Sequence, residues 1–428
     1  MRSSTADGRM RMNSNETSRA IWMDTPLANL ASESARMAGV GDPNDAGWTW
    51  TLPSQYPDLI PLGGGIPDAP TIPTEQFREA LNAVLDEEAD DAMVYGGWTG
   101  FDGLREVMAD RQNRIEGLDL DADNFIIHNG SSAAMDNIAK GFINQGDVVI
   151  VEGPSFSGIV ETIQAYLAEV VEVPIDDDGI SLEAVASAIA EAESAGKTVK
   201  MIYTIPDYHN PTGVTMSDSR RRALLDLCAV HRVLLVEDGA YSELYFDDAP
   251  PRSMYALSDG YGVMRVGSFS KVAATGLRIG WVQARHEITS ALTKVRYDMG
   301  TSPILLRAMA RYLKTGHLET HVAEMRDLYT LKCRTLCDSL EEHCAQYVRF
   351  TRPEGGFFLW LECIGASASE VRLAAAEEGL IFPSGSTFFH DPDKARDKYL
   401  RLAFSSASVE QMRQVGPRLA STFRKVVD

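Results

Sequence analysis

Short apolar runs alternate with amphipathic stretches between residues 75 and 300 of the chain. Five of these runs are rich in β-branched and other apolar residues, and each is followed by polar residues or glycine: residues 124–128, 147–152, 199–206, 232–238 and 262–268. The stretches between them have the apolar spacing of helices, as in residues 181–195 and 217–231. This alternation predicts an α/β domain whose short strands form a mostly parallel, buried central sheet flanked by helices.

The pattern changes after residue 300. Residues 300–345 are typical of long helices, and short strands with intervening helix are expected at residues 352–362, 379–385 and 399–405. We therefore predict a smaller α+β lobe in this part of the chain. Because 428 residues exceed what one ordinary core supports, we divide the chain into four parts. These are a leader (1–20), an N-terminal segment contributing to the small lobe and to an active-site loop (21–74), a large domain (75–305) and a small C-terminal domain (306–428).

The N-terminal segment contains a loop with an unusual composition. Residues 21–60 hold a short helix-like stretch and then a loop, and residues 62–73 (LGGGIPDAPTIP) follow. Three glycines and then alternating prolines exclude a regular helix or a central strand, so this string predicts a shaped loop. Residues 1–20 are polar and lack the apolar core of a secretory signal, and we expect them to form a disordered leader.

The net charge and the cysteine content limit the binding partners and the cellular location that we expect for the protein. A formal net charge of −21 repels nucleic-acid phosphates and anionic lipid head groups. No apolar run reaches the length of a membrane span. Five cysteines, an odd number in a long chain, argue against a disulfide framework and for a reducing compartment. We therefore expect no nucleic-acid partner, no membrane and a cytoplasmic location.

Two pairs of side chains have a spacing that could suit metal ligands. Cys333 and Cys337 stand four residues apart on a predicted helix, and His317 and His321 have the same spacing. The cysteines lack the paired spacing of a zinc site, and the glutamate in HLETH is misplaced for a zinc-protease helix. We therefore expect buried or half-buried thiols and no metal.

The polar residues that follow the predicted strands are the candidates for chemistry, because ligands of open α/β sheets bind beyond the carboxyl ends of the strands. They are residues 129–132, 153–156, 207–213, 238–241 and 268–271. The most informative string is residues 267–281, GSFSKVAATGLRIGW, in which serines flank Lys271 and Arg278 follows seven residues later. A lysine amine condenses with carbonyls, whereas hydroxyls and a second cation suit a phosphate. A lone lysine is ordinarily a surface residue, but this combination fits a carbonyl cofactor that carries a phosphate.

The strings from about Leu62 to Ser406 resemble, in order and spacing, the fold-type I enzymes that use pyridoxal 5'-phosphate (PLP). The resemblance is to class I/II aminotransferases, in the branch that includes kynurenine/2-aminoadipate aminotransferases and the catalytic half of MocR-type regulators. It implies a large domain with a mostly parallel sheet, a smaller lobe, PLP as cofactor, and amino-group transfer between an L-amino acid and a 2-oxo acid with ping-pong kinetics.

The resemblance also implies roles for individual residues. Lys271 would bond covalently to the cofactor aldehyde and act as base and acid, and Phe156 would stack on the pyridine ring. Asp238 would keep the pyridine nitrogen protonated, and Asn210 and Tyr241 would hydrogen-bond the cofactor's phenolic oxygen. The phosphate would be held by Ser131, Ser132, Ser268, Ser270 and Arg278.

The remaining implied roles concern the substrate and a second subunit. Arg401 would bind the substrate α-carboxylate, with Asn210 close by, and the backbone of Gly64 and Gly65 would approach the substrate. Tyr95 would reach the phosphate bound by a neighbouring subunit, which implies a homodimer with shared active sites.

The sequence departs from the family pattern near the expected cofactor. The string after Tyr95 is GGWTGFDG, so Trp98 either shapes the substrate pocket or only packs, and His209 replaces the more usual glutamine before Asn210. These changes leave the substrate open. They also leave open another PLP-dependent outcome, such as elimination, decarboxylation or oxidation. A regulatory or binding protein on the same fold is a further alternative, although MocR-type regulators carry a DNA-binding helix-turn-helix where only a short polar leader is expected here.

Overall fold

The computed structural model describes residue 19 and residues 22–37, 58–391, 394 and 396–427. The predicted leader, apart from Arg19, and much of the predicted loop before residue 60 lie outside the described residues. Within the described N-terminal part the chain forms a 3-10 turn, η1 (Leu27–Leu30), and a short helix, α2 (Glu33–Met37).

A mixed sheet of eight strands forms the centre of the larger lobe, in the order β2–β9–β8–β7–β6–β3–β4–β5. The strands are β2 (Phe125–His128), β3 (Val148–Gly153), β4 (Glu169–Asp176), β5 (Gly179–Ile180), β6 (Val199–Thr204), β7 (Leu234–Asp238), β8 (Val263–Ser268) and β9 (Gly280–Gln283). Each pair from β8 through β4 is parallel, while β9 runs antiparallel to both of its neighbours and β5 runs antiparallel to β4. The prediction of a mostly parallel central sheet is confirmed.

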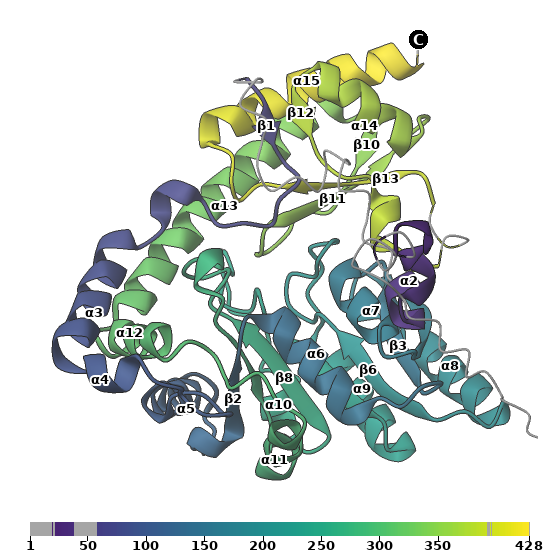
Figure 1. Ribbon diagram of the computed structural model, residues 1–428. Helices are drawn as coiled ribbons and strands as arrows, with labels where there is room; N and C mark the ends of the chain where they lie inside the picture. The colour runs from purple at the N-terminus through teal and green to yellow at the C-terminus, as the bar shows by residue number, and fades with distance from the viewer. Residues whose placement is uncertain (1–18, 20–21, 38–57, 392–393, 395, 428) are drawn as a thin grey trace, which may run out of the picture.

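Helices cover both faces of this sheet (Figure 1). One face packs against α6 (Ser131–Phe142), α7 (Ser157–Gln164) and α11 (His286–Lys294). The other face packs against α8 (Leu182–Ser194), α9 (Asp218–His231) and α10 (Met254–Leu257). Because alternate strand residues point to opposite faces, neighbouring positions of one strand contribute to different cores: Val149 and Val151 to the first, Val148 and Ile150 to the second.

A third core connects the larger lobe to the smaller one. It contains residues of α3 (Thr74–Glu87), α4 (Ala89–Ala92), α5 (Asp102–Glu116), α12 (Pro303–Lys314) and α13 (His317–Cys344). In Figure 1, α3 and α12 lie side by side, as their contacts require, and α13 runs from there into the small lobe. Three short 3-10 turns connect elements of the larger lobe: η3 (Ala69–Thr71) before α3, η4 (Ala122–Asn124) before β2, and η5 (Thr275–Leu277) between β8 and β9.

The small lobe contains a three-stranded antiparallel sheet in the order β10 (Val348–Arg349), β11 (Phe358–Cys363) and β13 (Tyr399–Ala403). A separate parallel pair joins β1 (Ile60–Pro61) to β12 (Leu380–Ile381), so a segment from the N-terminal part lies in this lobe. The helices α14 (Ala368–Glu377) and α15 (Val409–Val427) pack together, and η6 (Gly385–Phe388) lies between β12 and β13.

The described residues contain no helix that is both long and apolar enough to cross a membrane. In the same residues, no group of three or more histidine, cysteine, aspartate or glutamate side chains is arranged to hold a metal ion. All five cysteines are buried and free; the sulfur atoms of Cys333 and Cys337 are 4.0 Å apart.

Candidate active site

A cavity of about 500 Å³ lies at the carboxyl ends of the central strands, between the sheet, the glycine-rich loop and the small-lobe sheet. The structure brings into this cavity all but one of the residues to which the family resemblance assigns a role. They are Gly64, Gly65, Ser131, Ser132, Phe156, Asn210, Asp238, Tyr241, Ser268, Ser270, Lys271, Arg278 and Arg401.

One end of the cavity is a concentration of hydrogen-bond donors. Ser131 and Ser132, the first residues of α6, line this end of the cavity. The residue before them is Gly130, so no side chain caps the start of the helix. The first amide groups of a helix have no partner within the helix, so this end attracts anions. The hydroxyls of Ser268 and Ser270 lie 2.8 Å apart, and Arg278 completes the group.

Two glycines make this donor cluster compact. Gly130 has a φ of +83°, and a Cβ atom there would stand 2.5 Å from Arg278 Nη2. A Cβ atom on Gly280, in β9, would meet the backbone of Gly130 and Ser131 at 2.4 Å. Gly280 requires glycine because a side chain would meet this backbone. Gly130 favours glycine because of its positive φ, and a side chain there would also displace Arg278.

Lys271 follows β8 and projects into the same cavity, where its Nζ donates a hydrogen bond to the Gly65 carbonyl oxygen at 2.6 Å. Burial lowers the pKa of Lys271 to about 8, and the positive charges of Arg401 and Arg278 lower it as well, against the opposing effect of Asp238. A larger fraction of this amine than of an exposed lysine is uncharged near neutral pH.

Asp238 is the last residue of β7 and is almost fully buried. Its Oδ1 accepts a hydrogen bond from the Ala240 amide at 3.0 Å, and its Oδ2 accepts one from the Tyr203 hydroxyl at 2.7 Å. Burial raises the pKa of Asp238, whereas these two hydrogen bonds and the charge of Lys271 lower it. The site therefore contains a carboxylate held by two donors in a water-poor environment.

Aromatic and amide side chains form the walls between these charges. Phe156 lines the cavity at the start of α7 and packs against the core of that face. Tyr241 is held edge-on between Phe357 and Phe358, with ring centroids 5.6 Å from each, and burial raises the pKa of its hydroxyl. Asn210 is buried and uses its Oδ1 as an acceptor for Arg401 Nη1 at 3.0 Å.

Arg401, on β13, is the buried cation of the small-lobe side of the cavity. Its guanidinium lies 4.4 Å from the ring centroid of Phe358 and 4.5 Å from that of Phe388, and Nη2 donates to the Gly63 carbonyl. Burial lowers its pKa to about 10, which leaves it charged at neutral pH. Such a planar cation can recognise a carboxylate with two parallel hydrogen bonds.

Buried polar contacts to the residues just after Gly65 hold the glycine-rich loop in place. The hydroxyl of Ser405 donates to the Ile66 carbonyl at 2.6 Å, and Tyr329 accepts from the Asp68 amide at 3.0 Å. Lys332, buried on α13, bonds the Ser405 carbonyl at 2.8 Å and pairs with Asp68 at 3.1 Å. The backbone of Gly64 and Gly65 is thereby held against the cavity.

Tyr95 is the predicted site residue that the structure does not bring to the cavity. It follows α4 and is 80% exposed. The surface around it is rich in exposed large apolar side chains, namely Met93, Val94, Trp98, Tyr297 and Met299. Residues 93–98 and 296–300 are adjacent, since Arg296 Nη1 donates to the Trp98 carbonyl at 2.7 Å.

Several residues of the site were not predicted from the sequence. Ile66, Ile205, Thr275 and Phe358 also line the cavity. Ile205 and Phe358 belong to apolar runs that look like core in a sequence, and Ile66 and Thr275 lie in connecting segments, so none of them gave a signal. His209 was noted only as a departure; it is buried, and its Nε2 lies 3.1 Å from Glu152 Oε2. Tyr203 lies within a predicted buried strand and carries no local signal of a role, although a buried tyrosine in such a strand usually needs a hydrogen-bond partner.

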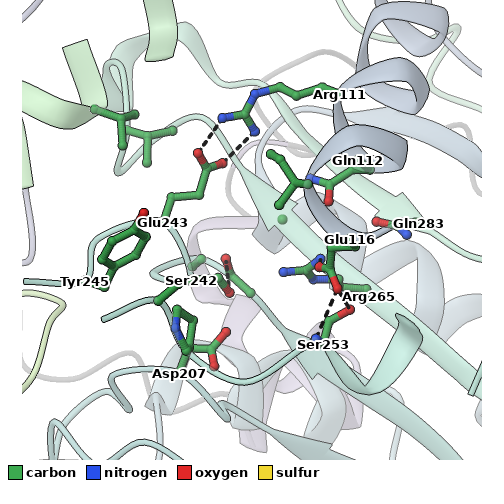
Figure 2. A pocket seen from close by; sticks show the side chains of 18 of the residues that line it. Arg111, Gln112, Glu116, Asp207, Ser242, Glu243, Tyr245, Ser253, Arg265 and Gln283 are labelled. Carbon is green, nitrogen blue, oxygen red and sulfur yellow. Dashed lines mark hydrogen bonds and ion pairs between the residues drawn. The ribbon is translucent and has the colours of Figure 1, made fainter. Parts of the chain in front are cut away.

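A second cavity, of about 360 Å³, lies beside the first and shares Ala240 and Ser268 with its wall. Figure 2 shows Arg111 facing Glu243 on one side of it and Glu116 with Ser253 on another. Glu116 also pairs with Arg265. These charged groups neutralise one another and join α5 to the loop after β7. We therefore interpret the charged lining of the second cavity as a structural network of ion pairs.

The fold agrees with the comparisons to known proteins. The family model described as aminotransferase class I and II matches residues 57–419. The chain belongs to this family. It is 32% identical over 371 residues to an aromatic-amino-acid aminotransferase of Thermococcus litoralis, covering 86% of this chain and 88% of that protein. It is 29% identical over 377 residues to a 2-aminoadipate transaminase of Thermus thermophilus, covering 87% and 91%.

A solved structure is similar over nearly the whole chain. The kynurenine aminotransferase of Pyrococcus horikoshii, crystallised in complex with PMP, superposes with a TM-score of 0.84 at 29% identity and covers 94% of this chain and 99% of that chain. The protein is a PLP-dependent aminotransferase that acts on an amino acid and a 2-oxo acid.

The cavity of this aminotransferase fits a phosphorylated aldehyde cofactor. The donor cluster around Arg278 suits a phosphate, and beside it glycine is favoured at Gly130 and required at Gly280. A lysine with a lowered pKa and a buried carboxylate face the rest of the cavity. The donor set therefore offers a partner for each charged or reactive group of PLP.

Proposed function

We propose that the residues lining this cavity bind PLP and the substrate in distinct roles. Ser268, Ser270 and Arg278, together with the start of α6 at Ser131 and Ser132, would hold the phosphate. Phe156 would lie against the ring, Asp238 would pair with the ring nitrogen, and Asn210 and Tyr241 would bond the phenolic oxygen. The observation that carries this proposal is the convergence of Lys271, Asp238, Arg401 and the donor cluster on one cavity.

The chemistry would be divided between the cofactor and the chain. When bound, PLP supplies an aldehyde for the amino group and an electron-withdrawing ring. Lys271 Nζ would hold the cofactor at its aldehyde and, as a free amine, would take the substrate α-proton and later return a proton. Arg401 would hold the substrate carboxylate, and the backbone of Gly64 and Gly65 would close the substrate side. Two half-reactions that share one site give ping-pong kinetics.

We further propose that the amino donor has an apolar or aromatic side chain. Ile66 and Phe358 line the cavity near Arg401, and neither carries a charge that would select an acidic or basic donor. The relative from Thermococcus litoralis is described as an aromatic-amino-acid aminotransferase, which supports the same choice.

The homodimer remains part of the proposal. The exposed apolar surface formed by Met93, Val94, Tyr95, Tyr297 and Met299 would be covered by a second copy of the chain. Tyr95 would then reach the phosphate site of the other subunit. A reducing compartment such as the cytoplasm is the proposed location, supported by five free and buried cysteines.

A half-reaction experiment tests this function. Holoenzyme is mixed with one L-amino acid and no 2-oxo acid, and the 2-oxo product and the cofactor absorbance are measured. We expect one equivalent of product per site and conversion of the cofactor to its amine form, followed by recovery of the original spectrum when a 2-oxo acid is added. Continuous product formation without an acceptor would show elimination, decarboxylation or oxidation and would overturn the proposal. Phenylalanine, leucine, aspartate and lysine as separate donors test the proposed preference.

A further inference from the structure

Tyr203 and Asp238 meet across two neighbouring strands. In the register of β6 and β7, Tyr203 lies opposite Val236, which precedes Asp238 by two residues. Alternate residues of a strand share a face, so Tyr203 and Asp238 are diagonal neighbours on the face covered by α6 and α7. The hydroxyl of Tyr203 spans this diagonal and donates to Asp238 Oδ2 at 2.7 Å.

The two donors to Asp238 fix the orientation of its carboxylate. The Ala240 amide binds Oδ1 at 3.0 Å and the Tyr203 hydroxyl binds Oδ2. An ionised carboxylate accepts about four hydrogen bonds, so each oxygen keeps capacity for a donor in the cavity. Tyr203 itself is fully buried and does not line the cavity. It can therefore act on the reaction only through Asp238.

The hydrogen bond also affects the charge of Asp238. Burial and the neighbouring Glu152 favour the neutral acid, whereas Tyr203, the Ala240 amide and Lys271 favour the carboxylate. A phenol is suited to this task because burial and the nearby carboxylates raise the pKa of Tyr203, which keeps it a neutral donor. Without it, the Ala240 amide is the one hydrogen-bond donor to Asp238 that remains among the described residues.

We propose that Tyr203 is a positioning residue that holds Asp238 ionised and oriented toward the ring nitrogen of the bound cofactor. This inference rests on the proposed function, in which Asp238 pairs with that nitrogen. The competing explanation is that Tyr203 only fills the core and satisfies its own hydroxyl with the nearest acceptor. The two explanations differ in whether the electronic state of the cofactor responds to the hydroxyl.

The test compares Tyr203→Phe with Tyr312→Phe in the holoenzyme. Both side chains are fully buried tyrosines, but the Tyr312 hydroxyl has no hydrogen-bond partner among the described residues. Phenylalanine keeps the ring volume in both variants and removes only the hydroxyl. For each protein, we would measure kcat and KM, the midpoint of urea unfolding, and the pH midpoint of the visible absorbance change of the bound cofactor.

We expect kcat of Tyr203→Phe to fall by roughly tenfold or more with little change in KM, since one hydrogen bond to a charged group is lost away from the substrate. Asp238 becomes more basic without the phenol, draws the proton from the ring nitrogen and weakens the ring's electron withdrawal. The pH midpoint of the absorbance change should therefore move upward by about half a unit or more. Tyr312→Phe should match the native protein in both measurements.

A native spectrum, native pH midpoint and native kcat in Tyr203→Phe would overturn the inference, as would a loss of stability with no spectral change. If Tyr203→Phe does not fold, 3,5-difluorotyrosine at position 203 gives a second test. Its more acidic hydroxyl is a stronger donor, so the pH midpoint should move downward, and an unchanged midpoint would reject the inference.

Asp238→Asn separates this inference from the proposed function. If Asp238→Asn shifts the spectrum and Tyr203→Phe does not, then Asp238 pairs with the ring nitrogen and Tyr203 is a core residue. If neither variant shifts the spectrum, the proposed role of Asp238 is itself wrong.

Discussion

The environment of Lys271 predicts how its amine reacts. Burial lowers its pKa to about 8, so the uncharged amine becomes the major form above that pH. The rate at which PLP bonds to the apoenzyme should therefore rise with pH and level off above about 8 to 9, whereas an exposed lysine would still gain reactivity near its ordinary pKa of about 10.4. Stopped-flow absorbance measures this rate, and a lysine peptide serves as control. A rate that still rises in parallel with the peptide above pH 9 would contradict the lowered pKa.

Borohydride identifies the residue itself. Reduction should fix the cofactor to a single peptide containing Lys271, because its Nζ is the lysine amine in the cavity lining. Peptide mass mapping measures the label. A labelled peptide without Lys271 would reject the assignment.

Asp238 provides the second test at this scale. Asp238→Asn keeps the shape and removes the charge, so we expect PLP to bind while kcat falls by about a hundredfold or more, because the protonated ring nitrogen loses its partner. Asp247→Asn is the matched control, since Asp247 lies in the same loop region and its side chain is 77% exposed. Kinetics on both variants decide, and near-native turnover of Asp238→Asn would reject the pairing with the ring.

Replacing Arg401 distinguishes a role in substrate binding from a role in the later steps. Arg401→Lys retains a cation but not the planar fork, so activity on α-amino acids should fall by roughly tenfold to a few hundredfold. Slow reactions with amines that lack a carboxylate should be spared, and the spectrum of the cofactor bound to Lys271 should be unchanged. Arg334→Lys, at an exposed position, is the control. An equal loss on both substrate types would mean that Arg401 only joins the two lobes through Gly63 and Asn210.

At the scale of elements, the start of α6 depends on the chain having no side chain at Gly130. Gly130→Ala would place a Cβ atom 2.5 Å from Arg278 Nη2, at a φ of +83°. Gly117→Ala shares the positive φ, +65°, but meets nothing within 4 Å. Gly117→Ala should lose about 1 kcal/mol of stability from backbone strain, and Gly130→Ala about 1–3 kcal/mol, because its ψ of 168° lies in a region essentially restricted to glycine. Only Gly130→Ala should weaken PLP binding, by tenfold or more, as titration of the apoenzymes would measure. Equal PLP affinity in the two variants would remove Arg278 from the phosphate site.

The elements that the sequence predicted and those it missed differ in their surroundings. Each of the five apolar runs became a strand, because a strand covered on both faces must be apolar throughout. β4 was missed because its exposed residues, Glu169, Pro174 and Asp176, interrupt the apolar pattern near the sheet edge. β9 was missed because it begins at the end of the lysine string, with two of its four residues inside it, and runs antiparallel to its neighbours. Register and direction depend on distant partners, which a local pattern does not contain.

The residues of the candidate site also fall into those that the sequence predicted and those that it missed. Residues that a recognisable string ties to a chemical task, such as Lys271 and Asp238, were predicted to share a site from the family resemblance and from their positions after predicted strands. Residues that act through packing, such as Ile66, Phe358 and Tyr203, became visible only when the strands were aligned. A tyrosine in an apolar strand does not reveal which carboxylate it will reach.

At the scale of the molecule, a chain with a net charge of −21 surrounds a site that is locally positive. Lys271, Arg278 and Arg401 come from both sides of the cavity, two from the larger lobe and one from the small-lobe strand β13. An anionic phosphate and carboxylate would therefore bind against the overall field, and Arg401 is held in place by buried contacts. The division into domains at residues 74/75 and 305/306 remains a proposal, since α13 belongs to the core that joins the two lobes.

The proposed dimer makes a prediction that only two copies of the chain can satisfy. If Tyr95 completes the site of the neighbouring subunit, a site consists of Lys271 from one chain and Tyr95 from the other. Tyr95→Ala and Lys271→Ala should each be strongly impaired as homodimers. A mixed dimer of the two contains one site with both native residues, so co-expression and purification of the heterodimer with two different tags should restore roughly half of the native turnover. Tyr261→Ala, at another exposed tyrosine, should be as active as the native protein. Sedimentation measures the assembly in each case. A fully active monomer, or a mixed dimer no more active than its parents, would show that Tyr95 does not act across the interface.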